Sequence, residues 1–320
     1  MRKIIVAAVA AASMSMAAPA TAQDDYPTKP VTILVPAAAG GPSDTVGRLV
    51  ADAMSSDLGQ QVLVENVGGA GGSLGTGRVA AAAPDGYTLL LYHIGVSTFA
   101  ALYPDLAYKP SEAFDSIGLV TDVPMTVVGK KDLPPKDLAG LMEYLKGEGA
   151  GATFGTAGVG AVSDLCGRLL VDATGIKVTT VPYKGTGPAM TDLVGGQIDL
   201  MCDQTTNTVN HIKSGTIKPY AVTTKERIQV LPDVPTLNEG GVGGFEITAW
   251  HAIWAPKGTP EPVRQKLSAA LQKALTNPTV VDRFAALGTA PVSAEQATPA
   301  ALDERFKSEI ERWGKLLAAQ

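Results

Sequence analysis

The chain has 320 residues, of which 45% are hydrophobic and 18% are charged, and its formal net charge is −5 at pH 7. This is an ordinary globular composition, and the length is enough for one large domain or two smaller ones. The acidic balance gives no support for a nucleic-acid partner, because such partners favour a clustered excess of Lys and Arg.

The first 22 residues carry the pattern of a secretion signal. The basic start "MRK" is followed by the apolar run "IIVAAVAAASMSMAA", and "ATA" before Gln23 fits a small-residue cleavage site. Cleavage would remove Arg2 and Lys3 and take the net charge from −5 to −7. No later segment has the roughly 18 consecutive apolar residues of a membrane-spanning helix, and the first cysteine is Cys166, far from the new N-terminus. We therefore predict a signal peptide over residues 1–22 and a periplasmic protein without a lipid anchor.

Apolar runs that are typical of strands alternate with helical patterns along the rest of the chain. The predicted strands are 31–35, 61–65, 87–92, 125–129, 152–156, 178–183, 197–202, 218–223 and 251–256. The clearest helices are 43–58, 261–276 and a C-terminal helix that carries Leu302, Phe306, Ile310, Trp313 and Leu317 on one face. This alternation predicts βαβ units, mostly parallel sheets and an α/β fold.

Three turns at strand ends consist almost entirely of small residues. They are "AAAGGPSD" (37–44), "GTAGVGAVSD" (155–164) and "PYKGTGPAM" (182–190). The first two place Ser-Asp at the start of a helix, so we expect Ser43 and Ser163 to cap these helices and to leave backbone N–H groups facing an anion. The plainer interpretation is that these residues only cap and punctuate the turns.

A catalytic interpretation rests on "GGSLG" (71–75), which matches the nucleophile-elbow pattern G-x-S-x-G around Ser73. Such an elbow needs an acid and a histidine, and the three histidines, His93, His211 and His251, show no characteristic spacing. A chance match in a glycine-rich run is therefore favoured. The dinucleotide fingerprint, the Walker A sequence and metal-ligand spacings are absent. We predict no catalytic residue, no cofactor and no metal, and keep a secreted serine hydrolase as an alternative.

The motifs, taken in order, resemble those of the Bug (TctC-type) substrate-binding proteins, the periplasmic receptors of tripartite tricarboxylate transporters. They are "YPTKPVTILVPAAAGGPSDTVGR", "VENVGGAGGSLGT", "AAPDGYTLL", "VPYKGTGPAMTDLVGGQIDLMCD", "PDVPTLNEGG" and "WHAIWAPKGTPEPV", and they run from Tyr26 towards the C-terminus. The resemblance implies a type II periplasmic-binding fold, in which two α/β lobes joined by a two-strand hinge close on a small carboxylate.

The resemblance also implies the partners and the way the ligand is held. The ligand would be a dicarboxylate or tricarboxylate, an aromatic carboxylate or an amino acid, bound by backbone groups and bridging waters of two facing loops. The protein would be a monomer that serves the membrane subunits of the transporter. A ligand-sensing partner of a signalling receptor is the alternative within this class.

Carried onto this sequence, the resemblance predicts ligand-binding residues in several loops. They are Ala38, Ala39, Ser43, Asp44, His93, Ser97, Thr156, Gly158, Val159, Gly160, Ser163, Tyr183, Asp203 and Gln204. The sequence departs from the family pattern at Ala37, where an aromatic residue is common, at Asp164, where His is common, and at His251-Ala252, where an aromatic residue and Gly are common. These departures concern the identity of the ligand, because each would change the lining of the pocket.

We expect lobe I to comprise residues 26–123 and 250–320, and lobe II to comprise residues 124–249. The runs "MTVVG" (125–129) and "HAIWAP" (251–256) each follow a completed series of strands and helices and could form the two crossing strands.

Cys166 and Cys202 are the only cysteines. We predict that they lie close together in one lobe, because the helix that carries Cys166 could cover the strand that ends at Cys202. An exported protein can form a disulfide, and two buried thiols acting as small apolar side chains are the alternative.

Overall fold

The computed structural model describes residues 26–318, so the predicted signal peptide lies outside the described residues. The fold is α/β, as predicted from the sequence, and its strands follow the order β2-β1-β3-β9-β4-β7-β5-β6, with β8 paired to β4. The prediction of mostly parallel sheets is wrong, because every pairing made by β4 and β9 is antiparallel. The strands are β1 (Val31–Val35), β2 (Val62–Asn66), β3 (Thr88–His93), β4 (Phe114–Lys130), β5 (Ala152–Thr156), β6 (Val178–Pro182), β7 (Leu200–Gln204), β8 (Ile217–Val222) and β9 (Thr248–Pro256).

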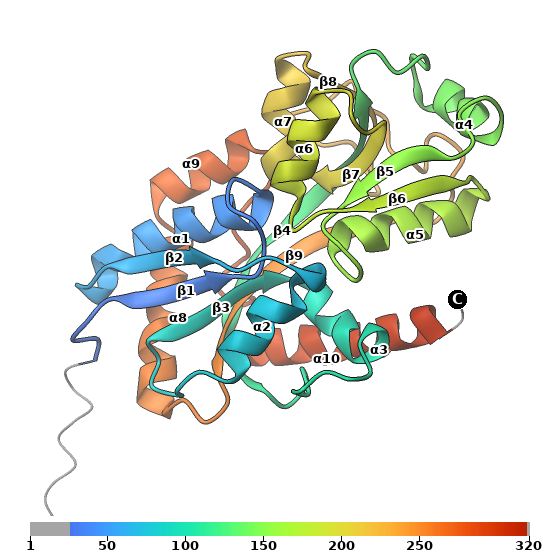
Figure 1. The fold of residues 1–320 in the computed structure, drawn as a ribbon. Helices are drawn as coiled ribbons and strands as arrows, with labels where there is room; N and C mark the ends of the chain where they lie inside the picture. Colours follow the sequence, from blue (N-terminus) through green and yellow to red (C-terminus); the bar gives the residue numbers. More distant parts are fainter. Residues whose placement is uncertain (1–25, 319–320) are drawn as a thin grey trace, which may run out of the picture.

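Helices cover both faces of this curved array (Figure 1). They are α1 (Pro42–Leu58), α2 (Ser73–Ala80), α3 (Phe99–Leu102), α4 (Leu138–Lys146), α5 (Val162–Thr174), α6 (Thr186–Val194), α7 (Thr205–Lys213), α8 (Glu261–Leu275), α9 (Pro278–Ala286) and α10 (Pro299–Ala318), with 3-10 turns at Ala70–Gly72 and Ile94–Thr98. The apolar face of α1 buries Val46, Val50 and Met54, as its periodicity predicts. No helix within residues 26–318 has the length and apolar character needed to cross a membrane.

The strands divide into two groups, and these groups are the two lobes of the molecule. In lobe I, β1 pairs in parallel with β2 and β3, and in lobe II, β5 pairs in parallel with β6 and β7. The first part of β4 pairs with β9, and its last part, from Met125, pairs with β7 and β8. Strands β4 and β9 therefore connect the lobes, as Figure 1 shows. The residues at which one lobe ends and the other begins stay a prediction.

Each predicted strand has a counterpart, but β4 begins at Phe114, well before the predicted start at residue 125. The added segment, "FDSIGLVTDVP", contains two aspartates and a proline and lacks a clear strand pattern. It is extended because it pairs antiparallel with β9 and because Asp115 forms an ion pair with Lys257 at 2.8 Å. Long-range pairing of this kind overrides local propensity.

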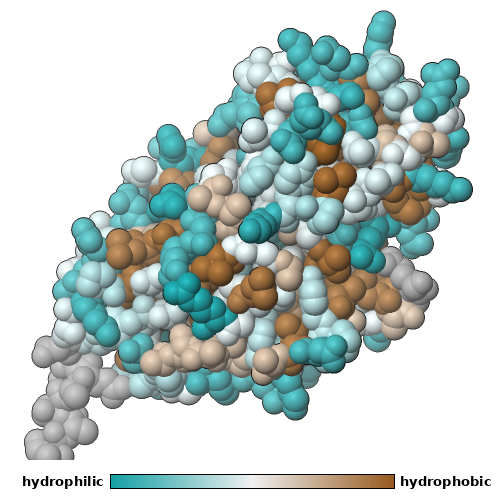
Figure 2. Space-filling model, in the orientation of Figure 1, coloured by the Kyte–Doolittle hydropathy of each residue, from teal (hydrophilic) through white to brown (hydrophobic). Residues whose placement is uncertain are grey.

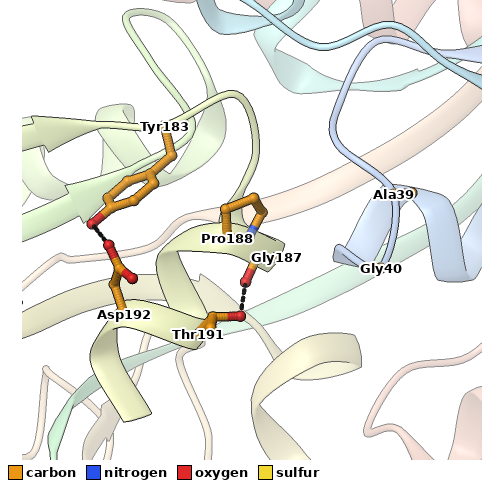
Figure 3. Close-up of a pocket in the computed structure, with 7 residues that line it drawn as sticks. All are labelled: Ala39, Gly40, Tyr183, Gly187, Pro188, Thr191 and Asp192. Carbon is orange, nitrogen blue, oxygen red and sulfur yellow. Dashed lines mark hydrogen bonds between the residues drawn. The ribbon is translucent and has the colours of Figure 1, made fainter. Parts of the chain in front are cut away.

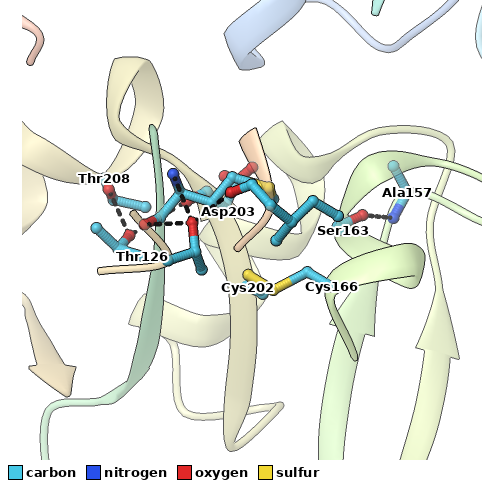
Figure 4. Close-up of a disulfide and its surroundings, with 10 residues drawn as sticks. Thr126, Ala157, Ser163, Cys166, Cys202, Asp203 and Thr208 are labelled. Carbon is cyan, nitrogen blue, oxygen red and sulfur yellow. Dashed lines mark hydrogen bonds between the residues drawn. A yellow bond between two sulfur atoms is a disulfide. The ribbon is translucent and has the colours of Figure 1, made fainter. Parts of the chain in front are cut away.

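Cys166 on α5 and Cys202 on β7 are joined by a disulfide, with their Cα atoms 6.2 Å apart (Figure 4). The predicted proximity of the two cysteines in one lobe is confirmed, and of the two interpretations the disulfide is the one observed. Both residues are fully buried. The bond therefore attaches the first turns of α5 to the end of β7, next to Asp203 and Gln204.

Candidate ligand-binding site

A cavity lies between the two lobes, at the carboxyl ends of β1, β3, β5 and β7. The carboxyl ends of parallel strands are a common place for ligands in α/β sheets. The lining of this inner cavity comprises Pro36, Ala37, Gly41, Pro42, Ser43, Tyr92 and His93 from lobe I, and Ala157, Val162, Ser163, Lys184, Thr186, Asp203 and Gln204 from lobe II. No arginine within residues 26–318 lines this cavity, so that part of the chain offers no guanidinium group that could hold a ligand carboxylate by two hydrogen bonds.

The turn before α1 is organised by Asp44. Its Oδ2 accepts hydrogen bonds from the backbone N–H of Gly40 at 2.9 Å and from Nε of Arg48 at 3.0 Å. Burial alone would raise the pKa of Asp44, but the hydrogen bonds from Arg48, Gly40 and Asn66 hold it below its ordinary value. The carboxylate is therefore ionised at neutral pH and is committed to its own loop.

The turn before α5 repeats this arrangement. Oδ2 of Asp164 accepts from the backbone N–H of Gly160 at 3.0 Å and from Nε of Arg168 at 2.8 Å. The two helices begin with "SDTVGR" (43–48) and "SDLCGR" (163–168), so both share the pattern Ser-Asp-x-x-Gly-Arg. The Ser-Asp pair at the two helix starts is thus part of a longer repeated pattern.

The predicted capping role of Ser43 and Ser163 is wrong. The N-cap residues are Gly41 and Ala161, and neither helix start has a side-chain cap. Oγ of Ser163 instead accepts from the N–H of Ala157, at 2.9 Å (Figure 4), while Ser43 contacts a histidine of β9. Since first-turn N–H groups have no acceptor inside a helix, the backbone amides of both serines are available at the cavity, together with the positive ends of α1 and α5.

The histidine that contacts Ser43 is His251. Its Nδ1 lies 2.9 Å from the carbonyl oxygen of Ala249, which can only accept, so Nδ1 carries the proton. Its Nε2 lies 3.0 Å from Oγ of Ser43 and must then accept the hydroxyl proton. Burial lowers the pKa of His251 to about 4, so the ring is neutral at pH 7.

His93 shows the opposite tautomer. Its Nδ1 accepts from the N–H of Gly95 at 3.0 Å, so the neutral ring carries its proton on Nε2. Burial and the neighbouring ring of His251, whose centroid is 5.6 Å away, lower the pKa of His93 well below its ordinary value. His93 therefore supplies a neutral N–H donor to the lining of the inner cavity.

Asp203 and Gln204 end β7 in the same cavity. Oδ2 of Asp203 accepts from Nδ2 of Asn207 at 2.6 Å, and its backbone oxygen accepts from Oγ1 of Thr126 at 3.2 Å (Figure 4). Within residues 26–318, Oδ1 of Asp203 and Oε1 of Gln204 are buried without a hydrogen-bond partner. Burial raises the pKa of Asp203 to about 6.

Other predicted site residues form contacts between the lobes. The N–H of Ala38 donates to the carbonyl of Lys184 at 3.0 Å, and the hydroxyl of Tyr103 donates to the carbonyl of Val159 at 2.7 Å. The carbonyl of Gly160 accepts from Oγ1 of Thr98 at 3.3 Å. These bonds hold the cleft closed along two rims.

The loops at these rims are rich in glycine because there is no room for larger side chains. A Cβ on Gly71 would lie 1.8 Å from the carbonyl oxygen of Val159, and Gly71 adopts φ of 60°, which favours glycine. A Cβ on Gly68 would lie 2.3 Å from the carbonyl oxygen of Lys184. Glycines at these positions let the two lobes approach backbone to backbone.

The remaining predicted residues lie elsewhere. Ala39 and Tyr183 line a second, outer pocket with Gly187, Pro188 and Asp192, where the hydroxyl of Tyr183 donates to Oδ2 of Asp192 at 2.6 Å (Figure 3). The side chains of two others bond locally: Oγ of Ser97 donates to Ile94 O at 2.5 Å, and Oγ1 of Thr156 accepts from Gly158 N at 3.2 Å.

Of the predicted ligand-binding residues, the inner cavity brings together Ser43, His93, Ser163, Asp203 and Gln204. The prediction missed the contact of Ser43 with His251 and the lining residues Tyr92, Lys184 and Thr186. His251 is one of the departures from the family pattern, and Lys184 and Thr186 belong to the small-residue turn "PYKGTGPAM". These are the signals from which the missed residues could have been found.

The surface around the cleft mixes polar and apolar side chains, as Figure 2 shows for the face seen in Figure 1. Leu74 of lobe I and Val159 of lobe II are among the exposed large apolar residues. Because Gly71 meets Val159 when the cleft is closed, the segments that carry these residues are neighbours on the closed rim.

Comparison with known proteins shows the family to which the chain belongs. The model of the family described as "Tripartite tricarboxylate transporter family receptor" (TctC) matches residues 46–320. A protein from the TAR-I ttuE-ttuC′ intergenic region of Agrobacterium vitis is 68% identical over 93% of this chain and 86% of its own length. The periplasmic binding protein BugD superposes with a TM-score of 0.90 at 49% identity, covering 92% of this chain and 98% of BugD. MatC from Rhodopseudomonas palustris, solved with bound malate, gives a TM-score of 0.88 at 42% identity, covering 91% and 100% of the two chains.

Proposed function

The chain belongs to the TctC family of tripartite tricarboxylate transporter receptors, and from this premise we propose that it captures a small carboxylate in the inner cavity and delivers it to the membrane subunits of such a transporter. One observation carries the proposal: the N-termini of α1 and α5 meet at the inner cavity beside the neutral N–H of His93. Backbone N–H groups at helix starts bind anions without a cationic side chain.

The malate in the structure of MatC shows that a protein 42% identical to this chain accepts a carboxylate. A helix N-terminus contributes about 0.3–1 kcal/mol to an exposed anion and up to about 2 kcal/mol to a partly buried one. Two such ends, one from each lobe, would let a single carboxylate hold the lobes together. For closure about β4 and β9 we keep the limits predicted from the sequence, residues 26–123 and 250–320 for lobe I and 124–249 for lobe II, as part of the proposal.

The proposal includes the setting in which the protein works. BugD is a periplasmic binding protein, and the predicted signal sequence suits the same compartment here, with the receptor acting as a monomer. The hydrolase alternative gains nothing from Ser73, which begins α2 and whose hydroxyl bonds to no histidine within residues 26–318. Hydrolysis of an ester panel by the parent, lost in Ser73→Ala, would restore that alternative.

A thermal-shift screen followed by calorimetry tests the receptor function. A bound carboxylate stabilises the protein by mass action, by about 2.7 kcal/mol at a concentration one hundred times its Kd. We expect at least one acid of a library of dicarboxylates, tricarboxylates, aromatic acids and amino acids to raise the unfolding temperature. If uptake of that acid by cells is unchanged when the gene is deleted, the protein serves sensing instead of transport.

A further inference from the structure

The inner cavity holds more hydrogen-bond acceptors than a carboxylate can use. Asp203 is fully buried, lines the cavity, and has one carboxylate oxygen, Oδ1, without a partner within residues 26–318. A carboxylate ligand carries only acceptors, so it cannot satisfy this oxygen. A buried acceptor left unpaired costs about 1–3 kcal/mol, so its retention calls for a group that pairs with it.

Ser43 adds a second acceptor from the opposite lobe. Its hydroxyl proton is committed to Nε2 of His251, since Nδ1 of that ring donates to the carbonyl of Ala249. A serine whose proton is committed offers only lone pairs to anything else in the cavity. His251 thus turns Ser43 from a donor to the ligand into an acceptor.

The donors of the cavity lie in a different set of groups. They include the backbone amides at the starts of α1 and α5 and Nε2–H of His93, and these suit the carboxylate end of a ligand. The side chains of Lys184 and Thr186, which can also donate, line the cavity as well. The acceptors, Asp203 and Ser43, then face the part of the ligand beyond that carboxylate.

We propose that the ligand carries, besides its carboxylate, either an ammonium group that donates to Oδ1 of Asp203 and Oγ of Ser43, or a hydroxyl whose single hydrogen is accepted by Oδ1 of Asp203. The inference rests on the proposed function and narrows its substrate class to hydroxy acids and amino acids. A site built to bond such a group discriminates strongly against the analogue that lacks it, because the buried acceptor is then left unpaired.

Matched pairs of acids test the inference by calorimetry on the mature protein at pH 7.5. The pairs are L-malate and L-aspartate against succinate, L-glutamate against glutarate, and L-lactate against propionate. In each pair that binds, we expect the acid with the hydroxyl or ammonium group to bind at least about tenfold tighter than its analogue without that group. Malate compared with aspartate then separates the hydroxyl from the ammonium.

The variant Asp203→Asn keeps the size of the side chain but can turn an N–H towards the ligand. We expect it to lose most of the tenfold preference and to bind succinate as well as, or better than, the parent does. Asp172→Asn is the matched control, since it makes the same charge change on an exposed position of α5 and should keep the preference of the parent. Unfolding temperatures of the free proteins show whether each variant is folded.

The outcomes separate the two proposals. If the parent binds acids but takes succinate as tightly as malate and aspartate, the receptor function stands and this inference is overturned. The inference is also overturned if Asp203→Asn is folded and retains the full preference. If the parent binds no acid of any pair or of the wider library, the receptor function fails and takes this inference with it.

Discussion

The turns before α1 and α5 share a sequence pattern, and in each an aspartate accepts hydrogen bonds from a loop amide and an arginine. The two turns differ in the contacts that attach them to the rest of their lobes. In lobe I, Ser43 reaches His251 on β9. In lobe II, Ser163 bonds within its own loop, and Cys166, at the position that corresponds to Val46 in lobe I, is bonded to Cys202 on β7. The repeated Ser-Asp-x-x-Gly-Arg motif therefore determines the conformation of each turn. The contacts made over long distances in the sequence, with His251 in lobe I and with Cys202 in lobe II, determine which polar groups remain free to bind a ligand.

Removing the covalent anchor should have the largest effect on stability. The double variant Cys166→Ala/Cys202→Ala opens a loop with a sequence separation of 36, and it should lower the free energy of unfolding by about 4 kcal/mol. Denaturant unfolding under oxidising conditions measures the loss. A reducing agent should destabilise the parent and leave the double variant unchanged; equal stability of the oxidised parent and the variant would show that the bond does not anchor the turn.

The noncovalent anchor of lobe I should respond to pH instead. The pKa of His251 is about 4 in the folded state against an ordinary value of 6.5, so the unfolded chain binds the proton more readily. Its stabilising contribution, about 3 kcal/mol, is complete above pH 6.5 and is lost as the pH falls towards 4. Unfolding of the parent and of His251→Phe across this range measures it, with reducing agent excluded. The ring of His251 also lowers the pKa of His93, so the difference between the two proteins reports the coupled pair of histidines. A difference that does not change with pH would contradict the assignment.

Asp44 and Asp164 should contribute similar amounts to the stability of the two lobes. Asp44→Ala and Asp164→Ala each leave one loop amide, of Gly40 or Gly160, without its acceptor and remove the carboxylate partner of one arginine. Arg48 keeps its hydrogen bond to Oδ1 of Asn66. Each should lower the free energy of unfolding by about 1–3 kcal/mol. The loss from Asp44→Ala should fade as the pH drops below about 4, because the pKa of this carboxyl is lowered in the folded state and its contribution is present only above its unfolded value. A loss in one lobe alone would mean that the repeated pattern does not have the same role twice.

How much of this could be predicted from the sequence depends on the range of the contacts. The strands and the Ser-Asp helix starts were readable because apolar runs and small-residue turns are local signals. The first half of β4 was not, since only pairing with β9 makes it extended. The role of Ser43 was predicted wrongly because its partner, His251, is 208 residues away. The disulfide stayed open for the same reason, as spacing along the chain says nothing of the distance between Cα atoms.

The smallest effects on stability should come from replacing Ser43 and Ser163, and the two replacements should differ in their effect on ligand binding. Ser163→Ala leaves the N–H of Ala157 without its acceptor and should cost about 1–2 kcal/mol of unfolding free energy, with binding of the preferred acid weakened only slightly. Ser43→Ala removes a donor from His251 and an acceptor from the inner cavity. It should lower the free energy of unfolding by about 1 kcal/mol. It should also weaken the binding of acids with a hydroxyl or ammonium group several-fold more than the binding of their analogues without one, such as succinate. Calorimetry and denaturant unfolding on the same preparations give both quantities for each variant. Because the two serines occupy the same position in the shared pattern, any difference between them comes from their anchors. If both variants shift stability and binding alike, the contact with His251 does not distinguish lobe I from lobe II.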